Sequence, residues 1–204
     1  MLRGCLILGL IFCGVVAFGG EYNPVLNIGD PAPAWKNLPG VDGKTHSLAD
    51  LKETPVVVVV FTCNSCPYAV DYEDRINALA KEHAGDSPQA AVVAINVNLV
   101  PADSLAKMQT RAKEKGFAFP YLYDESQQIA KAYGATRTPE FFVLNKERKI
   151  VYMGAMDDNS NAEKVTKSYL KPAIAAALAG NTPEVNETVA VGCLIRFKRE
   201  RRGR

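Results

Sequence analysis

The sequence predicts an α/β fold with a central mixed β-sheet flanked by helices. Two unbroken apolar runs, residues 56–61 and 91–97, carry this prediction. Such runs, rich in β-branched residues, are typical of strands buried on both faces of a sheet. A stretch with helical spacing of its apolar residues follows each run, and this alternation of strand and helix is typical of layered α/β proteins.

Length and composition indicate one soluble globular domain. The chain has 204 residues, of which 48% are hydrophobic and 23% charged, which argues against disorder and against a protein with many membrane spans. Residues 196–204 carry a net charge of +5, and the remainder carries −3. The body is therefore not that of a basic nucleic-acid-binding protein. We expect a solvated tail, with contact to an anionic surface as the alternative.

Residues 1–19 are predicted to be a signal peptide. A basic residue precedes an uncharged apolar run, and Ala17-Phe18-Gly19 offers small residues before a cleavage point. The run is shorter than the roughly 20 residues that span a bilayer, so an uncleaved anchor is the weaker alternative. Lipidation of Cys13 is disfavoured by the bulky Phe12. We therefore expect an exported protein, periplasmic or secreted.

The mature chain is predicted to form one domain over residues 20–180 and a C-terminal extension over 181–204. Turn formers between residues 21 and 54 indicate short strands or a hairpin. After the strand at 56–61, spacing and glycine stops predict these elements: a helix from Pro67, a strand at 91–97, a helix at 103–115 ended by Gly116, a strand at 119–123, a helix at 125–133 closed by Gly134, paired strands at 140–144 and 149–153, and a helix at 161–178 kinked at Pro172.

Cys63 and Cys66 follow the first buried strand, and the third cysteine outside the signal peptide is Cys193. A bridge between Cys63 and Cys66 closes so small a loop that it would constrain the unfolded chain little, which favours a redox pair over a structural one. A helix start lowers a cysteine pKa from ~8.5 to roughly 3.5–7.5 in motifs of this kind. We expect Cys63, the more exposed, to attack and Cys66, at or inside the first turn, to resolve.

Residues 60–68 and 134–144 resemble the redoxin branch of the thioredoxin-like superfamily, which includes TlpA-like periplasmic oxidoreductases and AhpC/TSA-type peroxiredoxins. The resemblance implies a thioredoxin-like fold with an N-terminal extension and a central βα insertion at 91–116. It also implies an exported thiol–disulfide oxidoreductase that needs no cofactor. Its partners would be protein thiols and disulfides, with a membrane-bound or soluble reductant.

The same resemblance assigns a role to Thr138-Pro139. The bond before the proline would be cis and lie beside the active-site disulfide, because X-Pro bonds are the ones in which cis is accessible. The Thr138 backbone would pair with the extended chain of a bound substrate.

The sequence departs from its relatives in two places. The strand before the motif lacks the buried acid of thioredoxin, so the proton acceptor for Cys66 is unidentified. Peroxiredoxins have a threonine where Cys63 stands and an arginine where Pro139 stands, and Arg137 lies two residues from that position. A thiol peroxidase therefore remains an alternative function.

A metal-carrying chaperone of this fold, binding copper or zinc, is the second alternative. Zinc would need two further ligands beside the motif, and the mature chain offers only His46, His83 and Cys193. Copper carriers of this fold use a wider cysteine spacing and a later histidine. We therefore predict no metal site, and both histidines are expected to be structural or solvated.

Other polar residues are assigned to structure. Asp71, Glu73 and Asp74 are expected to form a solvated helix face, and Asp157-Asp158-Asn159 a turn and helix cap rather than a calcium loop. Tyr68 and Tyr72 are expected to pack, with Tyr68 lining a substrate groove as the alternative.

Cys193 lies in a strand-like segment, residues 188–196. A buried inert thiol is its simplest interpretation. Exported redoxin-like proteins resemble this chain in a Gly-Cys-x-Ile-basic ending, so we hypothesise a third redox cysteine that reaches the central pair.

Overall fold

The computed structural model describes residues 19–199. The predicted signal peptide, with Cys5 and Cys13, lies outside the described residues apart from residue 19, and so does the end of the basic tail, residues 200–204. No helix within residues 19–199 is long and apolar enough to cross a membrane.

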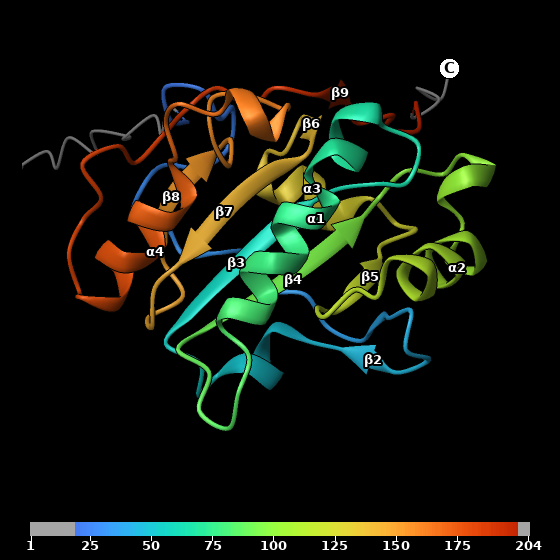
Figure 1. Cartoon of the computed structure of the whole chain (residues 1–204), viewed down its shortest axis with the longest axis horizontal. Coiled ribbons are helices and arrows are strands. Elements are labelled where there is room, and N and C mark those ends of the chain that lie inside the picture. The colour runs from blue at the N-terminus through green and yellow to red at the C-terminus, as the bar shows by residue number, and fades with distance from the viewer. Residues whose placement is uncertain (1–18, 200–204) are drawn as a thin grey trace, which may run out of the picture.

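A five-stranded mixed sheet forms the centre of the molecule (Figure 1). The strand order is β5-β4-β3-β7-β8; β3 runs parallel to β4, which runs parallel to β5, and β7 is antiparallel to both β3 and β8. The mixed sheet confirms the predicted fold class. The strands are β3 (Val56–Phe61), β4 (Ala90–Asn96), β5 (Tyr121–Tyr123), β7 (Glu140–Leu144) and β8 (Ile150–Gly154).

The run of valines in β3 is explained by burial on both faces. Val56, Val58 and Val60 pack into one core cluster, whereas Val57 and Val59 pack into the other. Successive side chains of a strand point to opposite faces, so a central strand covered on both sides has no position for a polar residue. This strand, predicted from its apolar run, has the expected bounds.

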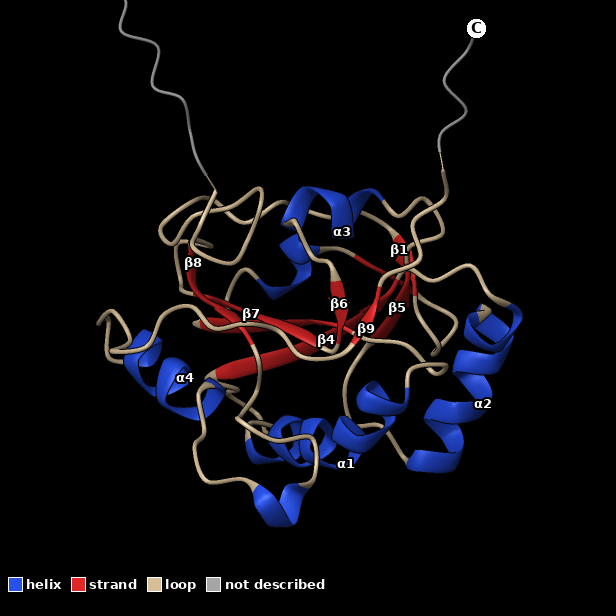
Figure 2. Ribbon diagram, turned by 90° about the horizontal axis from the view of Figure 1, so that it is seen from above, coloured by secondary structure: helices blue, strands red, loops and turns tan. Residues whose placement is uncertain are grey.

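Helices cover both faces of the sheet (Figure 2). One face carries α1 (Pro67–Glu82), α2 (Leu105–Lys115) and α4 (Leu170–Leu178), and the other carries α3 (Gln128–Tyr133). Gly116 and Gly134 end α2 and α3 in the left-handed conformation, with φ of 60° and 65°, as predicted. Short 3-10 helices lie at Leu48–Leu51, Pro101–Asp103 and Ala162–Lys164.

The last helix differs from its prediction over residues 161–178, because α4 begins only at Leu170. The Asp158 carboxylate accepts hydrogen bonds from the N–H and the hydroxyl of Thr166, and Asp157 pairs with Ser168 in an isolated antiparallel β-bridge. These contacts hold the residues before α4 in a loop. Pro172 therefore lies in the first turn of α4 rather than in a helix interior, and there its missing N–H breaks no helical hydrogen bond.

Two further pairs of short strands lie outside the main sheet. The predicted N-terminal hairpin is confirmed by β1 (Leu38–Pro39) and β2 (Thr45–His46). The second pair joins β6 (Arg137–Thr138) to β9 (Cys193–Leu194). It brings the C-terminal segment back to the loop between β3 and α1 (Figure 1).

Candidate active site

Cys63 and Cys66 lie between the end of β3 and the start of α1. Pro67 is the first helical residue, which places Cys66 at the N-cap, and the Ala69 N–H donates to its sulfur at 3.4 Å. Proline suits this first helical position, since the N–H that it lacks would have no helical partner. Both cysteines are buried, with only 3% of Cys63 and 1% of Cys66 exposed.

Thr138 and Pro139 lie beside the cysteines, and the bond between them is cis. The Thr138 hydroxyl is 3.5 Å from Cys63 Sγ, and Cys66 Sγ donates to the Thr138 carbonyl at 3.1 Å. The two sequence motifs, of which Cys66 and Thr138 are 72 positions apart along the chain, thus form one site.

The electrostatics favour Cys66 as the ionised thiol. A hydrogen bond from the Cys63 thiol, together with others from Cys193, Thr138 and the Ala69 N–H, lowers the pKa of Cys66 from 9.0 to about 4. Burial opposes this shift, and the Thr138 carbonyl favours the protonated form. The donors around the sulfur outweigh both, because a thiolate can accept several hydrogen bonds at once.

Cys63, the cysteine expected to attack, shows the opposite behaviour. Its hydrogen bond to Cys66 raises the pKa of Cys63, and burial and the negative charge of Asp103 raise it further. Because the helix begins at Pro67, its N-terminal N–H groups act on Cys66 instead.

Asp103 is a residue of this site that sequence reasoning missed. It is fully buried in η2 (Pro101–Asp103) and accepts hydrogen bonds from the Ser65 N–H at 2.9 Å and the Ser65 hydroxyl at 2.6 Å. The Ser65 hydroxyl lies 3.8 Å from Cys63 Sγ. A buried carboxylate is thus present, supplied by the loop after β4 rather than by the strand before the motif.

Cys193 also reaches the site. It lies opposite Thr138 in the β6–β9 pair and packs against a small cluster formed by Cys63, Cys66 and Ala69. None of the three cysteines is disulfide-bonded in the structure. The hypothesis that Cys193 lies within reach of the central pair therefore has a geometric basis.

A family model of the redoxins matches residues 27–170. The chain belongs to the redoxin family. This assignment agrees with the thioredoxin-like fold and with redox chemistry at cysteine.

Two solved structures resemble this redoxin over most of its length. A hypothetical protein, SMc02350 from Sinorhizobium meliloti 1021, is 35% identical with a TM-score of 0.79, covering 86% of this chain and 97% of its own. An uncharacterized conserved protein from Geobacillus kaustophilus is 32% identical with the same TM-score, covering 88% and 96%.

A curated relative from Mycobacterium tuberculosis is named "Putative peroxiredoxin Rv2521". It is 32% identical over 114 residues, which cover 54% of this chain and 65% of the relative. The match thus spans less than two thirds of the relative's length.

The acidic residues of α1 do not all form a solvated face. Asp71 and Asp74 are exposed as predicted, but Glu73 is 6% exposed and accepts two hydrogen bonds from Arg111, each of 2.8 Å. Its burial against α2 requires that partner, because an unpaired buried carboxylate is costly. No sequence pattern predicts this contact, which joins α1 to α2.

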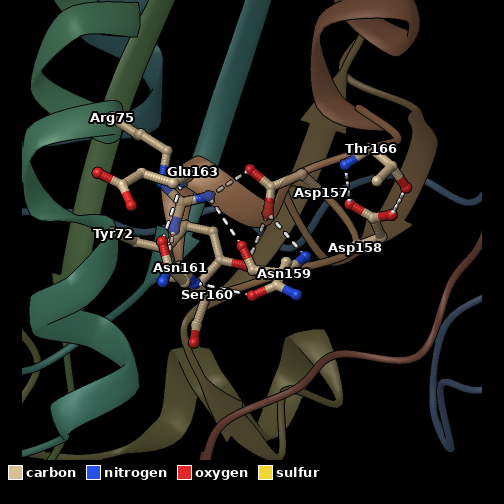
Figure 3. Close-up of polar contacts among 9 residues, drawn as sticks. All are labelled: Tyr72, Arg75, Asp157, Asp158, Asn159, Ser160, Asn161, Glu163 and Thr166. Atoms are coloured by element: carbon tan, nitrogen blue, oxygen red, sulfur yellow. Dashed lines mark hydrogen bonds and ion pairs between the residues drawn. The ribbon is translucent and has the colours of Figure 1, made fainter.

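The Asp157-Asp158-Asn159 run does not cap a helix as predicted, because the N-caps that follow it are Asn161 and Tyr169, and it forms a buried ionic contact instead (Figure 3). Asp157 is buried, binds Arg75 Nη1 at 2.5 Å and accepts from the Tyr72 hydroxyl at 2.8 Å. The Arg75 guanidinium also lies over the Tyr72 ring, 3.8 Å from its centroid. The run fastens the loop before α4 to α1.

The two histidines lie in other parts of the fold. His46 contacts Asp42 at 3.1 Å in the N-terminal hairpin, and His83 is the C-cap of α1. Tyr68, 41% exposed, lies at the start of α1. Within the described part of the chain, no three His, Cys, Asp or Glu side chains are arranged to hold a metal ion.

Proposed function

We propose that this redoxin is an exported thiol–disulfide oxidoreductase that exchanges a Cys63–Cys66 disulfide with partner proteins. The observation that carries the proposal is the position of the pair at the N-terminus of α1, beside Thr138 and the cis Pro139. A low-pKa cysteine next to a second thiol is the arrangement that disulfide exchange requires.

The exchange proceeds in two balanced steps. The Cys66 thiolate attacks a sulfur of a partner disulfide, forming a mixed disulfide and releasing one partner thiolate. Cys63 then loses its proton and attacks Cys66 Sγ, which releases the second partner thiolate and leaves the Cys63–Cys66 disulfide. Run in reverse, the same steps oxidise a partner dithiol.

Asp103 and Ser65 would handle the proton of Cys63. The Ser65 hydroxyl lies between the Asp103 carboxylate, at 2.6 Å, and Cys63 Sγ, at 3.8 Å. This places a proton acceptor within one hydroxyl of the resolving thiol, a geometry suited to general-base assistance. Asp103 would thus take the place of the buried acid that β3 lacks.

Export is proposed from the N-terminal sequence, whose short apolar run follows a basic residue. A redox-active disulfide is consistent with an oxidising compartment outside the cytoplasm. Cell fractionation of the natural host tests this point, and recovery of full-length protein from the cytoplasm alone would contradict it.

The test of function is catalysis of disulfide exchange by the purified mature protein. With insulin as the disulfide substrate and dithiothreitol as reductant, we expect catalysed reduction that is lost in the double variant Cys63→Ser/Cys66→Ser. The variant Cys193→Ser retains both thiols of the pair and serves as the control. Equal rates with the wild type and the double variant would contradict the proposal.

A thiol peroxidase is the second candidate, because a buried thiolate at a helix N-cap suits attack on a small peroxide. The name of the mycobacterial relative supports this candidate. The position of Arg137 argues against a peroxidase, because its guanidinium donates to the Gly192 carbonyl at 2.8 Å and not to a cysteine sulfur. Saturable peroxide consumption that survives Cys63→Ser would favour the peroxidase over exchange.

A further inference from the structure

The C-terminal segment, residues 192–198, lies on β6 as an added strand. Cys193 pairs with Thr138 and Leu194 with Arg137 in antiparallel register, and the Ile195 N–H donates to the Thr136 carbonyl at 2.8 Å. The edge that the redoxin resemblance assigns to an extended substrate chain is thus filled by the protein's own chain. The residue placed opposite Thr138 is a cysteine.

Gly192 allows this close approach. A Cβ atom at this position would lie 2.0 Å from the Thr138 carbonyl oxygen and 3.2 Å from the Pro139 nitrogen, so any other residue would force the segment away. The Arg137 guanidinium, which binds the Gly192 carbonyl at 2.8 Å, holds the backbone in place. The segment is therefore built for contact with the two residues next to the cysteines.

The segment is fixed firmly after Cys193. The Ile195 side chain is 6% exposed within the core, and the buried Gln127 amide donates to the Arg196 carbonyl at 3.0 Å and accepts from the Lys198 N–H at 2.8 Å. These contacts fix the position of the strand along β6.

Before Cys193 the chain is anchored at Thr188, whose N–H donates to the Met153 carbonyl at 3.0 Å, and at Gly192, with exposed valines between them. Val189 and Val191 are 54% and 57% exposed, and they border a groove of about 410 Å³ that Tyr68 and Tyr72 also line.

The Cys193 thiol completes a contiguous group of three sulfurs. It packs against the buried cluster that contains Cys66, and its hydrogen bond to that sulfur adds to the effect of burial, so that the pKa of Cys193 is raised to about 11. Cys193 is thus held as a donor to the Cys66 thiolate in the reduced protein. A sulfur in that position is also placed for exchange once Cys66 is oxidised.

We propose that Cys193 is a built-in disulfide partner of Cys66 and that β9 occupies the binding site of the partner chain. This inference rests on the proposed exchange function and adds an internal step to it. Cys193, as thiolate, attacks Cys66 Sγ of the Cys63–Cys66 disulfide; the Cys66–Cys193 bond forms, the Cys63–Cys66 bond breaks, and Cys63 takes up the proton that Cys193 gave up. The step consumes no external oxidant or reductant.

The internal disulfide would control access to the site. A partner chain can pair with Thr138 only after β9 has left it. The apparent affinity for a protein partner is therefore reduced in proportion to the fraction of molecules in which β9 is displaced. Small thiols and disulfides, which need no strand pairing, escape this control.

The test uses the mature protein with Cys63→Ser, in which the ordinary pair cannot close. Oxidised glutathione is expected to join Cys66 and then be expelled by Cys193, so that mass spectrometry of digested, non-reduced protein finds a Cys66–Cys193 bridge. Accumulation of a stable Cys66–glutathione adduct with free Cys193 would overturn the inference. Diamide applied to the same variant forms the bridge without glutathione and checks the result independently.

Gly192→Ala, introduced into the Cys63→Ser protein, tests whether bridge formation depends on the pairing of β9 with β6 or only on the closeness of the two thiols. We expect about a tenfold shift from the bridge toward the glutathione adduct, since displacement of β9 lowers the competent fraction. Val191→Ala, a neighbouring exposed position, should leave the ratio unchanged. An identical ratio in the glycine variant would overturn the role of β9.

The equilibrium of the wild-type Cys63–Cys66 pair with glutathione distinguishes failure of this inference from failure of the proposed function. If Cys63–Cys66 equilibrates with glutathione while Cys193 stays free, the proposed function stands and the inference falls. If the pair does not exchange with glutathione at all, the proposed function falls, whatever diamide shows for Cys193.

Discussion

Helix α1 carries two buried polar clusters that behave in opposite ways. In the ionic cluster, Arg75 and Asp157 neutralise one another, with the Tyr72 hydroxyl on the second carboxylate oxygen (Figure 3). In the redox cluster, Cys66 is surrounded by thiols, a hydroxyl and a peptide N–H. A paired charge stabilises the fold and stays inert, whereas an ionised sulfur held by neutral donors is stabilised and still nucleophilic.

The largest effect is expected from a substitution that removes the central thiol of the redox cluster. Cys66→Ser should slow disulfide exchange by about 10³-fold, because it removes the attacking thiolate. Cys63→Ser should still complete the first step, which a single-turnover assay measures as one equivalent of partner thiol released per protein. The opposite order, with first-step release lost in Cys63→Ser and kept in Cys66→Ser, would return the attacking role to Cys63.

Breaking the ionic cluster should cost stability and leave the chemistry intact. Asp157→Asn leaves Arg75 without its counter-charge, and we expect the free energy of unfolding to fall by about 3 kcal/mol in urea titrations. The matched control is Glu82→Gln, which breaks the exposed Glu82–Lys171 pair at the end of the same helix and should cost less than about 0.5 kcal/mol. A change in the glutathione equilibrium of the Asp157 variant would show that the clusters are coupled.

A smaller effect is expected from Asp103→Asn. The amide keeps the shape of the side chain but loses its charge, so the resolving step should slow by about tenfold. The pKa of Cys63 should fall, because the Asp103 charge is one of the causes that raise it. Stopped-flow measurement of mixed-disulfide decay tests the rate. An unchanged rate would remove Asp103 from the mechanism.

The smallest expected change is the effect of moderate acid on Cys66. A group with a pKa of about 4 stays ionised as the pH falls through the neutral range, whereas an unshifted thiol would lose about tenfold in thiolate per pH unit. The ultraviolet absorbance of the first thiolate to form in the reduced wild-type protein tests this, because burial and hydrogen bonds to Cys66 raise the pKa values of Cys63 and Cys193 and keep both thiols protonated in this range. A midpoint near 9 would contradict the assignment.

The fold was largely accessible from sequence because its signals are local. The apolar run of β3 and the glycines that end α2 and α3 each act within a few residues. The last helix was misplaced because Asp158 binds Thr166, a side-chain contact that competes with helix formation and leaves no periodic signal.

The site was accessible only in part. The cysteines and Thr138-Pro139 were identified from motifs, but Asp103 comes from the loop after another strand, and no spacing rule connects it to Ser65. The opposite pKa shifts of Cys63 and Cys66 depend on hydrogen bonds from Thr138, Cys193 and the Ala69 N–H, which are contacts that no sequence pattern records. The buried partners of Glu73 and Asp157 are likewise tertiary contacts.

The redox potential of the Cys63–Cys66 pair tests the central claim most directly. A thiolate stabilised at Cys66 stabilises the dithiol, which makes the disulfide oxidising. Equilibration of the Cys193→Ser protein with glutathione should therefore give a potential nearer to the roughly −120 mV of DsbA than to the roughly −270 mV of thioredoxin. A value at or below that of thioredoxin would contradict the account of Cys66 as a strongly stabilised thiolate.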